Sequence, residues 1–135
     1  MSDTEEDDSH KTPFELIGTE AVTRIAMRFY AVMAEEERAL ADLHECDEDG
    51  NIVRPMQEKF ALFLVGWLGG PQLYIEQYGH PRLRMRHQHV KIDKAMRDAW
   101  LRCMATALDE EKLGRPLREF LDERFYGMAD HLINV

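Results

Sequence analysis

The sequence contains little of what secreted, disulfide-stabilised or membrane-spanning proteins need. Only two cysteines, Cys46 and Cys103, occur among its 135 residues, which fits a reducing compartment better than a disulfide framework. No apolar run approaches the roughly 20 residues that span a bilayer. The acidic N-terminus also lacks the basic and then apolar order of a signal peptide. We therefore expect a cytoplasmic protein.

Positive charge is in the minority. The 17 lysines and arginines are outnumbered by 26 aspartates and glutamates, which gives a net charge of -9. Because this balance repels nucleic acid and anionic membranes, we expect neither as a partner. The hydrophobic fraction of 44% and the charged fraction of 32% are typical of a soluble globular protein. The length suits one domain with a core of its own.

No stretch alternates with period two for long enough to predict a strand. Apolar residues instead recur at helical spacing within the segments 22–33, 56–67, 96–108 and 117–132. We predict an all-α domain over residues 13–135, preceded by a disordered acidic tail over residues 1–12. The polar segment 35–51 is predicted to be a loop or a frayed turn. It lacks the alternating oxygen ligands and closing glutamate of a calcium loop.

Two helix-breaking runs lie in the middle of the chain. The run GGP at 69–71 ends one helix, because glycine tolerates left-handed dihedrals and proline lacks the backbone donor. The run GHP at 79–81 makes a second break. The following PRLRMRH is predicted to be a short helix with proline at its first position and His87 at its end. Such a rigid setting suits a histidine that binds a ligand.

Two alternatives remain open from the residues alone. Helical apolar stripes are also compatible with a plain bundle that acts as a cofactor-free interaction module, although the broken region 66–92 is not needed for packing. His80, His87 and His89 form an array that could hold zinc if a fourth ligand approached. We expect His80 and His89 to be exposed, which disfavours zinc.

The middle of the chain resembles a known family. Residues 66–104 read GWLGGPQLYIEQYGHPRLRMRHQHVKIDKAMRDAWLRCM. They are similar to the core of group II truncated haemoglobins, in which a GGP break, a GHPRLRxRH run and a tryptophan-containing helix recur together. The likeness extends from Phe14 to the C-terminus and departs from the family at His89 and Val90. It implies an all-α truncated globin, a two-over-two helical sandwich around haem b.

The resemblance also assigns roles to individual residues. His87 falls on the family's proximal histidine and is expected to bind iron through Nε2. Tyr30 and Trp100 fall on positions that donate hydrogen bonds to the bound ligand, and His44 falls on a variable loop position that adds a third donor or titrates near neutral pH. Lys59 and Arg86 are expected to pair with the haem propionates. The full set of expected haem-binding residues is His87, Tyr30, His44, Met56, Lys59, Phe60, Phe63, Arg86 and Trp100.

The resemblance implies binding of O2 and of other small ligands such as NO, CO and peroxide. Two hydrogen-bond donors beside the ligand slow its release, so redox or scavenging chemistry is a better expectation than oxygen transport. Peroxidase activity, for which His44 is the acid–base group at hand, and nitric oxide dioxygenase activity, which requires a reductase, are alternative main roles. Whether the protein is a carrier or an enzyme stays open, as does its oligomeric state.

Overall fold

The computed structural model describes residues 10–135 as an all-helical domain, as predicted. No strand occurs among these residues, although Cys46 and Ile52 form an isolated antiparallel bridge. None of the described helices is long and apolar enough to cross a bilayer. The disorder predicted for the tail falls mainly on residues 1–9, which lie outside the described part of the chain. The helices in chain order are α2 (Pro13–Ile17), α3 (Thr19–Glu36), α4 (Arg38–Ala41), α5 (Arg54–Trp67), α6 (Leu73–Tyr78), α7 (Leu83–His87), α8 (Lys94–Asp109) and α9 (Arg115–His131).

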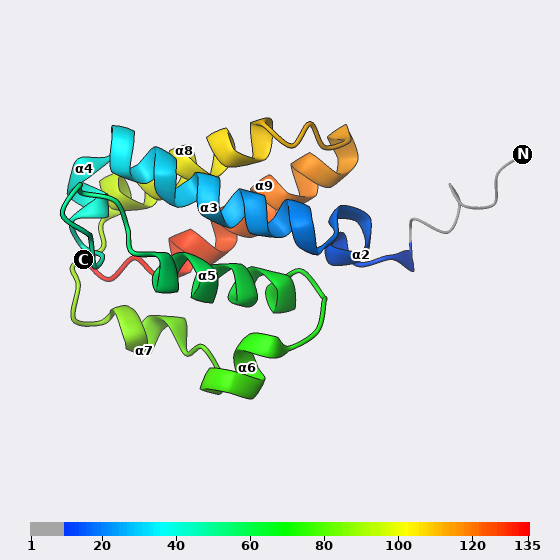
Figure 1. Ribbon diagram of the computed structural model, residues 1–135, viewed down its shortest axis with the longest axis horizontal. Helices are drawn as coiled ribbons and strands as arrows, with labels where there is room; N and C mark the ends of the chain where they lie inside the picture. Colours follow the sequence, from blue (N-terminus) through cyan, green and yellow to red (C-terminus); the bar gives the residue numbers. More distant parts are fainter. Residues whose placement is uncertain (1–9) are drawn as a thin grey trace, which may run out of the picture.

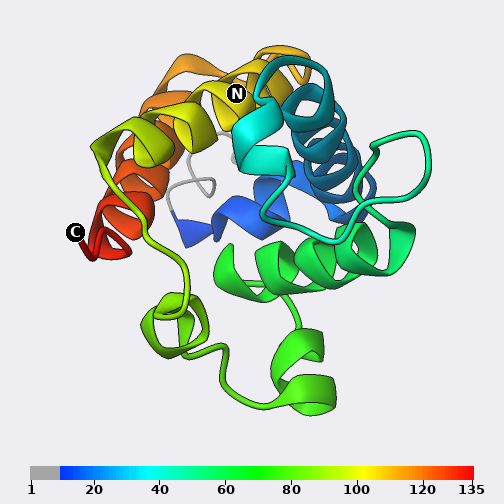
Figure 2. The same ribbon diagram turned by 90° about the vertical axis from the view of Figure 1, so that its left-hand side faces the viewer.

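The long helices form two layers. α3 packs against both α5 and α8, and α8 packs in turn against α9. Figures 1 and 2 show α3 with α5 in one layer and α8 with α9 in the other, while the short helices α6 and α7 lie below α5. This is the predicted two-over-two arrangement. It leaves α7 at the outer edge of the molecule, where only one side of it faces other helices.

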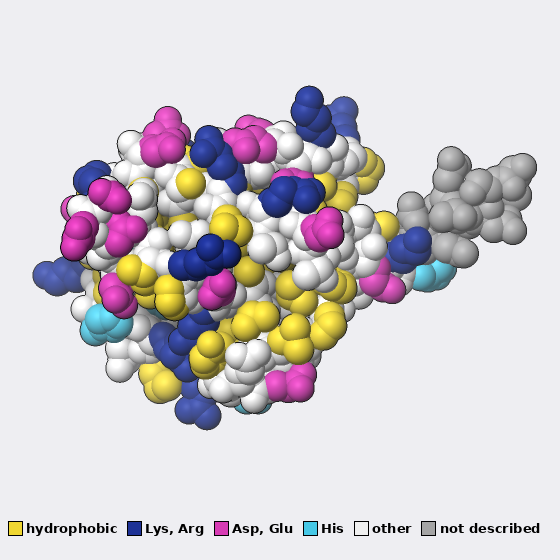
Figure 3. Space-filling model, in the orientation of Figure 1, with side chains coloured by type: hydrophobic (Ala, Val, Ile, Leu, Met, Phe, Trp, Pro, Cys, Tyr) yellow, Lys and Arg dark blue, Asp and Glu magenta, His cyan; other side chains and the backbone are white. Residues whose placement is uncertain are grey.

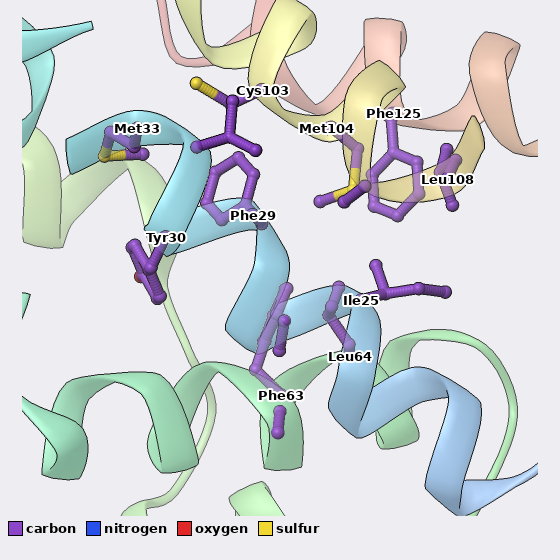
Figure 4. Packing of buried hydrophobic residues seen from close by; sticks show 14 of the residues in the cluster. Ile25, Phe29, Tyr30, Met33, Phe63, Leu64, Cys103, Met104, Leu108 and Phe125 are labelled. Atoms are coloured by element: carbon purple, nitrogen blue, oxygen red, sulfur yellow. The ribbon is translucent and has the colours of Figure 1, made fainter. Parts of the chain in front are cut away.

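α3 supplies the centre of the core, because its apolar residues recur every three or four positions. Ile25, Phe29 and Met33 are each no more than 2% exposed. Figure 4 shows them on successive turns of α3, with Leu64 of α5 on one side and Met104 of α8 on the other. Burying a side chain of this size stabilises the fold by roughly 1.5–3 kcal/mol. These contacts fix the positions of α5 and α8, the helices that flank the candidate site.

The N-terminal turn closes over the end of α5. Thr12 Oγ1 accepts from the Glu15 amide at 3.1 Å, and the Glu15 carboxylate accepts from the Thr12 amide at 2.9 Å, so α2 begins with a capping box. The Phe14 amide donates to the Leu68 carbonyl at 2.9 Å. A Cβ at Gly70 would lie only 2.7 Å from the Phe14 ring. Glycine at position 70 therefore allows α2 to lie against the end of α5.

The connection between α3 and α5 differs from the predicted loop over residues 35–51. α3 continues to Glu36, and α4 adds a further turn, so the loop prediction was wrong for these residues. Leu40 and Ala41 of α4 are buried. In the sequence this apolar pair is surrounded by charged residues, so its neighbours give no helical pattern. The segment is recognised as helical only from its burial against the rest of the structure.

Candidate functional site

A cavity of about 380 Å³ lies among α3, α5, α7 and α8. Cavities of this size hold small organic molecules and cofactors in other proteins. Most of its lining side chains are apolar or aromatic. All the residues that the family resemblance pointed to line this one cavity, namely Tyr30, His44, Met56, Lys59, Phe60, Phe63, Arg86, His87 and Trp100.

His87 is the last residue of α7. Its Nδ1 lies 2.7 Å from the Leu83 carbonyl oxygen. Because a carbonyl oxygen only accepts, Nδ1 carries the proton, and in the neutral ring the lone pair is on Nε2. The predicted start of this helix was wrong, since Pro81 lies outside it and Arg82 precedes it in a left-handed conformation with φ 47°.

The segment after His87 is held by the C-terminus. The Asn134 side-chain nitrogen donates to the Val90 carbonyl at 2.8 Å and to the His87 carbonyl at 3.4 Å. Asn134 Oδ1 accepts from the Ile92 amide at 2.8 Å, and the Asn134 amide donates to the Ile92 carbonyl at 2.9 Å. The sequence alone did not point to Asn134, because its partners lie more than 40 residues away in the chain.

Tyr30 and Trp100 bring polar atoms to the cavity. Within residues 10–135, neither the Tyr30 hydroxyl nor the Trp100 indole N–H has a hydrogen-bond partner, and neither atom is fully buried. Burial raises the pKa of Tyr30, so its hydroxyl keeps its proton and remains a donor. Both rings pack on Phe29, with centroids 5.0 Å from it in each case. Both residues line the cavity, and each has a donor to offer to an acceptor atom bound there.

His44 reaches the same cavity but already has one protein partner. Its Nδ1 donates to the Leu40 carbonyl at 3.0 Å, and its ring meets the Tyr30 ring edge-on with centroids 5.5 Å apart. Burial lowers the pKa of His44, so the neutral form is favoured. In that form Nε2 carries a lone pair, and His44 faces the cavity as an acceptor. The expected role as a third donor needs the protonated form, which burial opposes.

α5 supplies an apolar wall of the cavity. Phe60 and Phe63 are stacked with ring centroids 6.2 Å apart, and Phe60 also packs on Phe29 at 5.1 Å. Met56 lies one turn before Phe60 on the same helix and also lines the cavity. None of these side chains offers a donor or a basic nitrogen. The wall therefore excludes water without competing for a ligand.

Three cationic side chains line the cavity, and one of them, Arg97, is paired with Asp98 and Asp130. Lys59 Nζ lies 4.5 Å from the centre of the Tyr78 ring, a cation–π contact that leaves its N–H groups free for an anion. Arg86 is exposed and has no ion-pair or hydrogen-bond partner within residues 10–135. Both side chains are therefore available to a carboxylate that reaches the edge of the cavity.

The described residues give the zinc and calcium alternatives no support. In residues 10–135, no three His, Cys, Asp or Glu side chains gather in a group that could hold a metal ion. His80 and His89 are exposed, as predicted. In the polar loop, Asp47 Oδ1 accepts from the backbone amides of residues 49 and 51 at 2.9 and 3.0 Å. Its carboxylate therefore stabilises a turn.

Comparison with known proteins supplies the family. Residues 12–134 match the family model of bacterial-like globins. The chain belongs to this globin family. The globin is 36% identical over 126 residues to group 2 truncated hemoglobin YjbI of Bacillus subtilis. The aligned region covers 93% of the globin and 91% of the Bacillus protein. It is 30% identical over 96 residues to group 2 truncated hemoglobin 3-1 of Lotus japonicus, or 71% of the globin and 55% of the plant protein.

Solved structures of relatives have the same fold as this globin. The cold-adapted truncated hemoglobin of Pseudoalteromonas haloplanktis TAC125 superimposes with a TM-score of 0.84 at 41% identity, over 93% of the globin and 99% of that chain. The group II truncated hemoglobin of Bacillus anthracis gives a TM-score of 0.82 at 34% identity, over 93% and 92%. These matches confirm the resemblance and the fold. Globin homologues bind haem b, and the family supports binding of small gas ligands such as O2.

Proposed function

We propose that this globin binds haem b in the cavity through His87 Nε2. The supporting observation is the His87 ring, whose Nδ1 is tied to the Leu83 carbonyl while Nε2 keeps its lone pair at a largely apolar cavity. A hydrogen bond to the second ring nitrogen fixes the orientation of a haem-ligating imidazole and raises its basicity. Lys59 and Arg86, at the edge of the cavity, would pair with the haem propionates.

The distal residues act on the ligand that shares the cavity with the haem. Bound haem supplies an iron that takes up small ligands and changes oxidation state. Tyr30 and Trp100 then donate to an acceptor atom of that ligand, because neither donor is engaged by the protein within residues 10–135. Each such hydrogen bond contributes about 1.5–3 kcal/mol when the acceptor carries charge. We infer slow release of O2, with redox or scavenging chemistry as the role rather than oxygen transport.

His44 favours peroxidase activity as a second candidate function. Its Nδ1 is committed to the Leu40 carbonyl, so the neutral ring presents Nε2 as a base inside the cavity. Such a base would take the proton from one oxygen of a hydroperoxide and return it to the other as the O–O bond breaks, with two electrons and the second proton coming from an external reducing substrate. Nitric oxide dioxygenase activity uses the same distal donors but requires an electron source.

The haem assignment is tested by spectroscopy of His87→Gly. The wild-type protein loaded with haem should show a Soret band typical of histidine ligation, and His87→Gly should shift or lose it. Added imidazole should restore the band, because it fills the space of the missing ring. The control is His80→Ala, an exposed histidine outside the cavity. An unchanged spectrum in His87→Gly would contradict the proposal.

The two catalytic alternatives are separated by His44→Gln. If the globin is a peroxidase, peroxide turnover should fall by at least about tenfold, since a positioned acid–base group contributes roughly 10²–10⁴-fold. The Soret band of the ferric protein should stay in place. Equal peroxide turnover in the wild type and the variant would contradict a peroxidase role for His44. Turnover of nitric oxide by the O2-loaded protein would then test the dioxygenase alternative.

A further inference from the structure

α7 and its flanking residues carry positive charge only. Residues 77–92 contain Arg82, Arg84, Arg86 and Lys91 and no aspartate or glutamate, which makes four positive charges in a chain of net charge -9. All four side chains are exposed. We call Arg82, Arg84 and Arg86, which border or belong to α7, the α7 rim. Charge of the minority sign is thus concentrated on one short segment.

The α7 rim also differs from the other arginines in having no intramolecular partner. Elsewhere eight arginines form ion pairs with carboxylates, namely Arg24, Arg28, Arg38, Arg54, Arg97, Arg102, Arg115 and Arg118. Arg124 lies over the rings of Trp67 and Phe120. Within residues 10–135, the side chains of the rim arginines form no ion pair, hydrogen bond or cation–π contact. Because Arg86 would pair with a haem propionate, the charges of Arg82 and Arg84, which do not line the cavity, are the ones free to meet an external anion.

The α7 rim lies over the proximal wall of the cavity. Arg86 lines the cavity next to His87, whereas Arg82 and Arg84 do not line it. Their charges therefore lie outside the cavity in which the haem is proposed to bind. Figure 3 shows dark blue Lys and Arg side chains running from α5 down across the region of α7, below an upper left part with many acidic side chains. α7 buries none of its residues, so the wall between solvent and His87 is thin here.

The exposed apolar residues around the α7 rim are of the types found in protein interfaces. Met85 is 52% exposed and Tyr78 is 44% exposed. Arginine, methionine and tyrosine are enriched in protein–protein interfaces relative to the rest of the surface. A surface with this composition is suited to a compact protein that presents carboxylates. An extended polyanion such as DNA would also meet the acidic parts of the surface and be repelled there.

We propose that the α7 rim docks an acidic one-electron donor protein that reduces the haem. This inference rests on the proposed function, because it assumes haem bound next to His87. The globin family model accounts for residues 12–134, so the electron has to come from outside this domain. In the transfer, one electron leaves the reduced centre of the partner and ferric iron becomes ferrous. No covalent bond forms or breaks, and docking at α7 brings the donor to the thin wall beside His87.

Reduced plant-type ferredoxin is a suitable probe, as an acidic electron carrier with a potential of about -400 mV. Its binding to the ferric holoprotein is measured by calorimetry, and its reduction of the haem by stopped flow. The test variant is Arg82→Gln/Arg84→Gln. The control is Lys112→Gln/Arg115→Gln, which changes the charge equally at the α8–α9 turn, far from α7 in both Figures 1 and 2.

At about 20 mM salt, the rate of haem reduction by ferredoxin should be at least about fivefold lower in the test variant than in the wild type. In the control variant this rate should differ from the wild-type rate by less than about twofold. The calorimetric affinity should fall in parallel. Both differences should shrink at about 200 mM salt, because the attraction is screened. Reduction by a small neutral flavin should be equal in all three proteins, which checks that the haem itself is unaltered.

Equal rates and affinities for the test and control variants would overturn the docking proposal while leaving haem binding intact. Ferredoxin binding that is insensitive to salt would overturn it as well. So would salt-sensitive binding of duplex DNA or anionic vesicles together with no binding of ferredoxin. A wild-type protein that binds no haem, seen as absence of a Soret band, would overturn the proposed function itself, and the docking proposal with it.

Discussion

Asn134→Ala should speed haem release more than it lowers the stability of the fold. The side chain makes two hydrogen bonds of 2.8 Å, to the Val90 carbonyl and from the Ile92 amide, and a longer one of 3.4 Å to the His87 carbonyl. A typical intramolecular hydrogen bond contributes about 0.5–1.5 kcal/mol net. These bonds are solvent-exposed, so we expect a total near the low end, about 1–2 kcal/mol.

The lost hydrogen bonds stabilise the segment that follows His87, so the substitution should not affect the packing of the core. If local opening of residues 88–92 precedes haem release, a loss of about 1.4 kcal/mol speeds release about tenfold. Haem transfer to excess apomyoglobin, followed at the Soret band, measures this rate. Asn134→Asp keeps the acceptor for the Ile92 amide and loses the donor, so it should be intermediate. Val135→Ala, next to it and 67% exposed, is the control.

A lower midpoint of thermal unfolding with an unchanged haem transfer rate would mean that Asn134 stabilises the whole domain and not the proximal segment. Hydrogen exchange at the Ile92 amide gives a second readout, because this amide donates to Asn134 Oδ1. It should exchange faster in Asn134→Ala, while amides in the middle of α3 should be unaffected.

Tyr30→Phe and Trp100→Phe should each speed O2 dissociation by at least about tenfold in stopped flow, since each removes a donor worth about 1.5–3 kcal/mol; unchanged rates in both would show that neither donor meets the ligand. Gly70→Ala should destabilise the fold by about 1–3 kcal/mol because its Cβ would meet the Phe14 ring. Gly127→Ala, which has open space around it in α9, should instead stabilise the fold by up to about 1 kcal/mol. Equal changes in the free energy of urea unfolding for the two variants would exclude the steric explanation. Because burial lowers the pKa of His44, its neutral form stabilises the fold above the pKa of the unfolded chain, and this contribution is lost as pH falls through the folded pKa. Thermal unfolding of His44→Gln should therefore depend less on pH between about pH 7 and pH 5 than that of the wild type, and identical profiles would contradict this.

Local pattern predicted the long helices well, because their stability comes from apolar stripes that the sequence displays directly. It also predicted the end of α5 before the GGP run. The expected haem-binding positions came from the family resemblance, and the structure places them at one cavity. Their chemical roles stay predictions until the variants are measured.

What the sequence did not predict depends on contacts between distant segments. α4 buries only Leu40 and Ala41, too few residues to show a helical period. Asn134 is a single polar residue near the chain end, and its importance comes from carbonyl and amide groups at residues 87–92. The direction of the His44 hydrogen bond, which turns an expected donor into an acceptor, is likewise set by the position of the Leu40 carbonyl in α4.

Both ends of the domain brace the part of the chain that carries His87. Between Gly69 and Asp93, the one buried side chain is Tyr74, so this stretch has little hydrophobic contact with which to hold itself in place. Phe14 and Thr12 close on its start at Gly69 and Gly70, and Asn134 closes on its end. Haem bound at His87 would supply the missing apolar contacts in the middle. Hence we expect this stretch to be the least stable part of the haem-free protein, and haem binding to stabilise it more than the two layers of long helices.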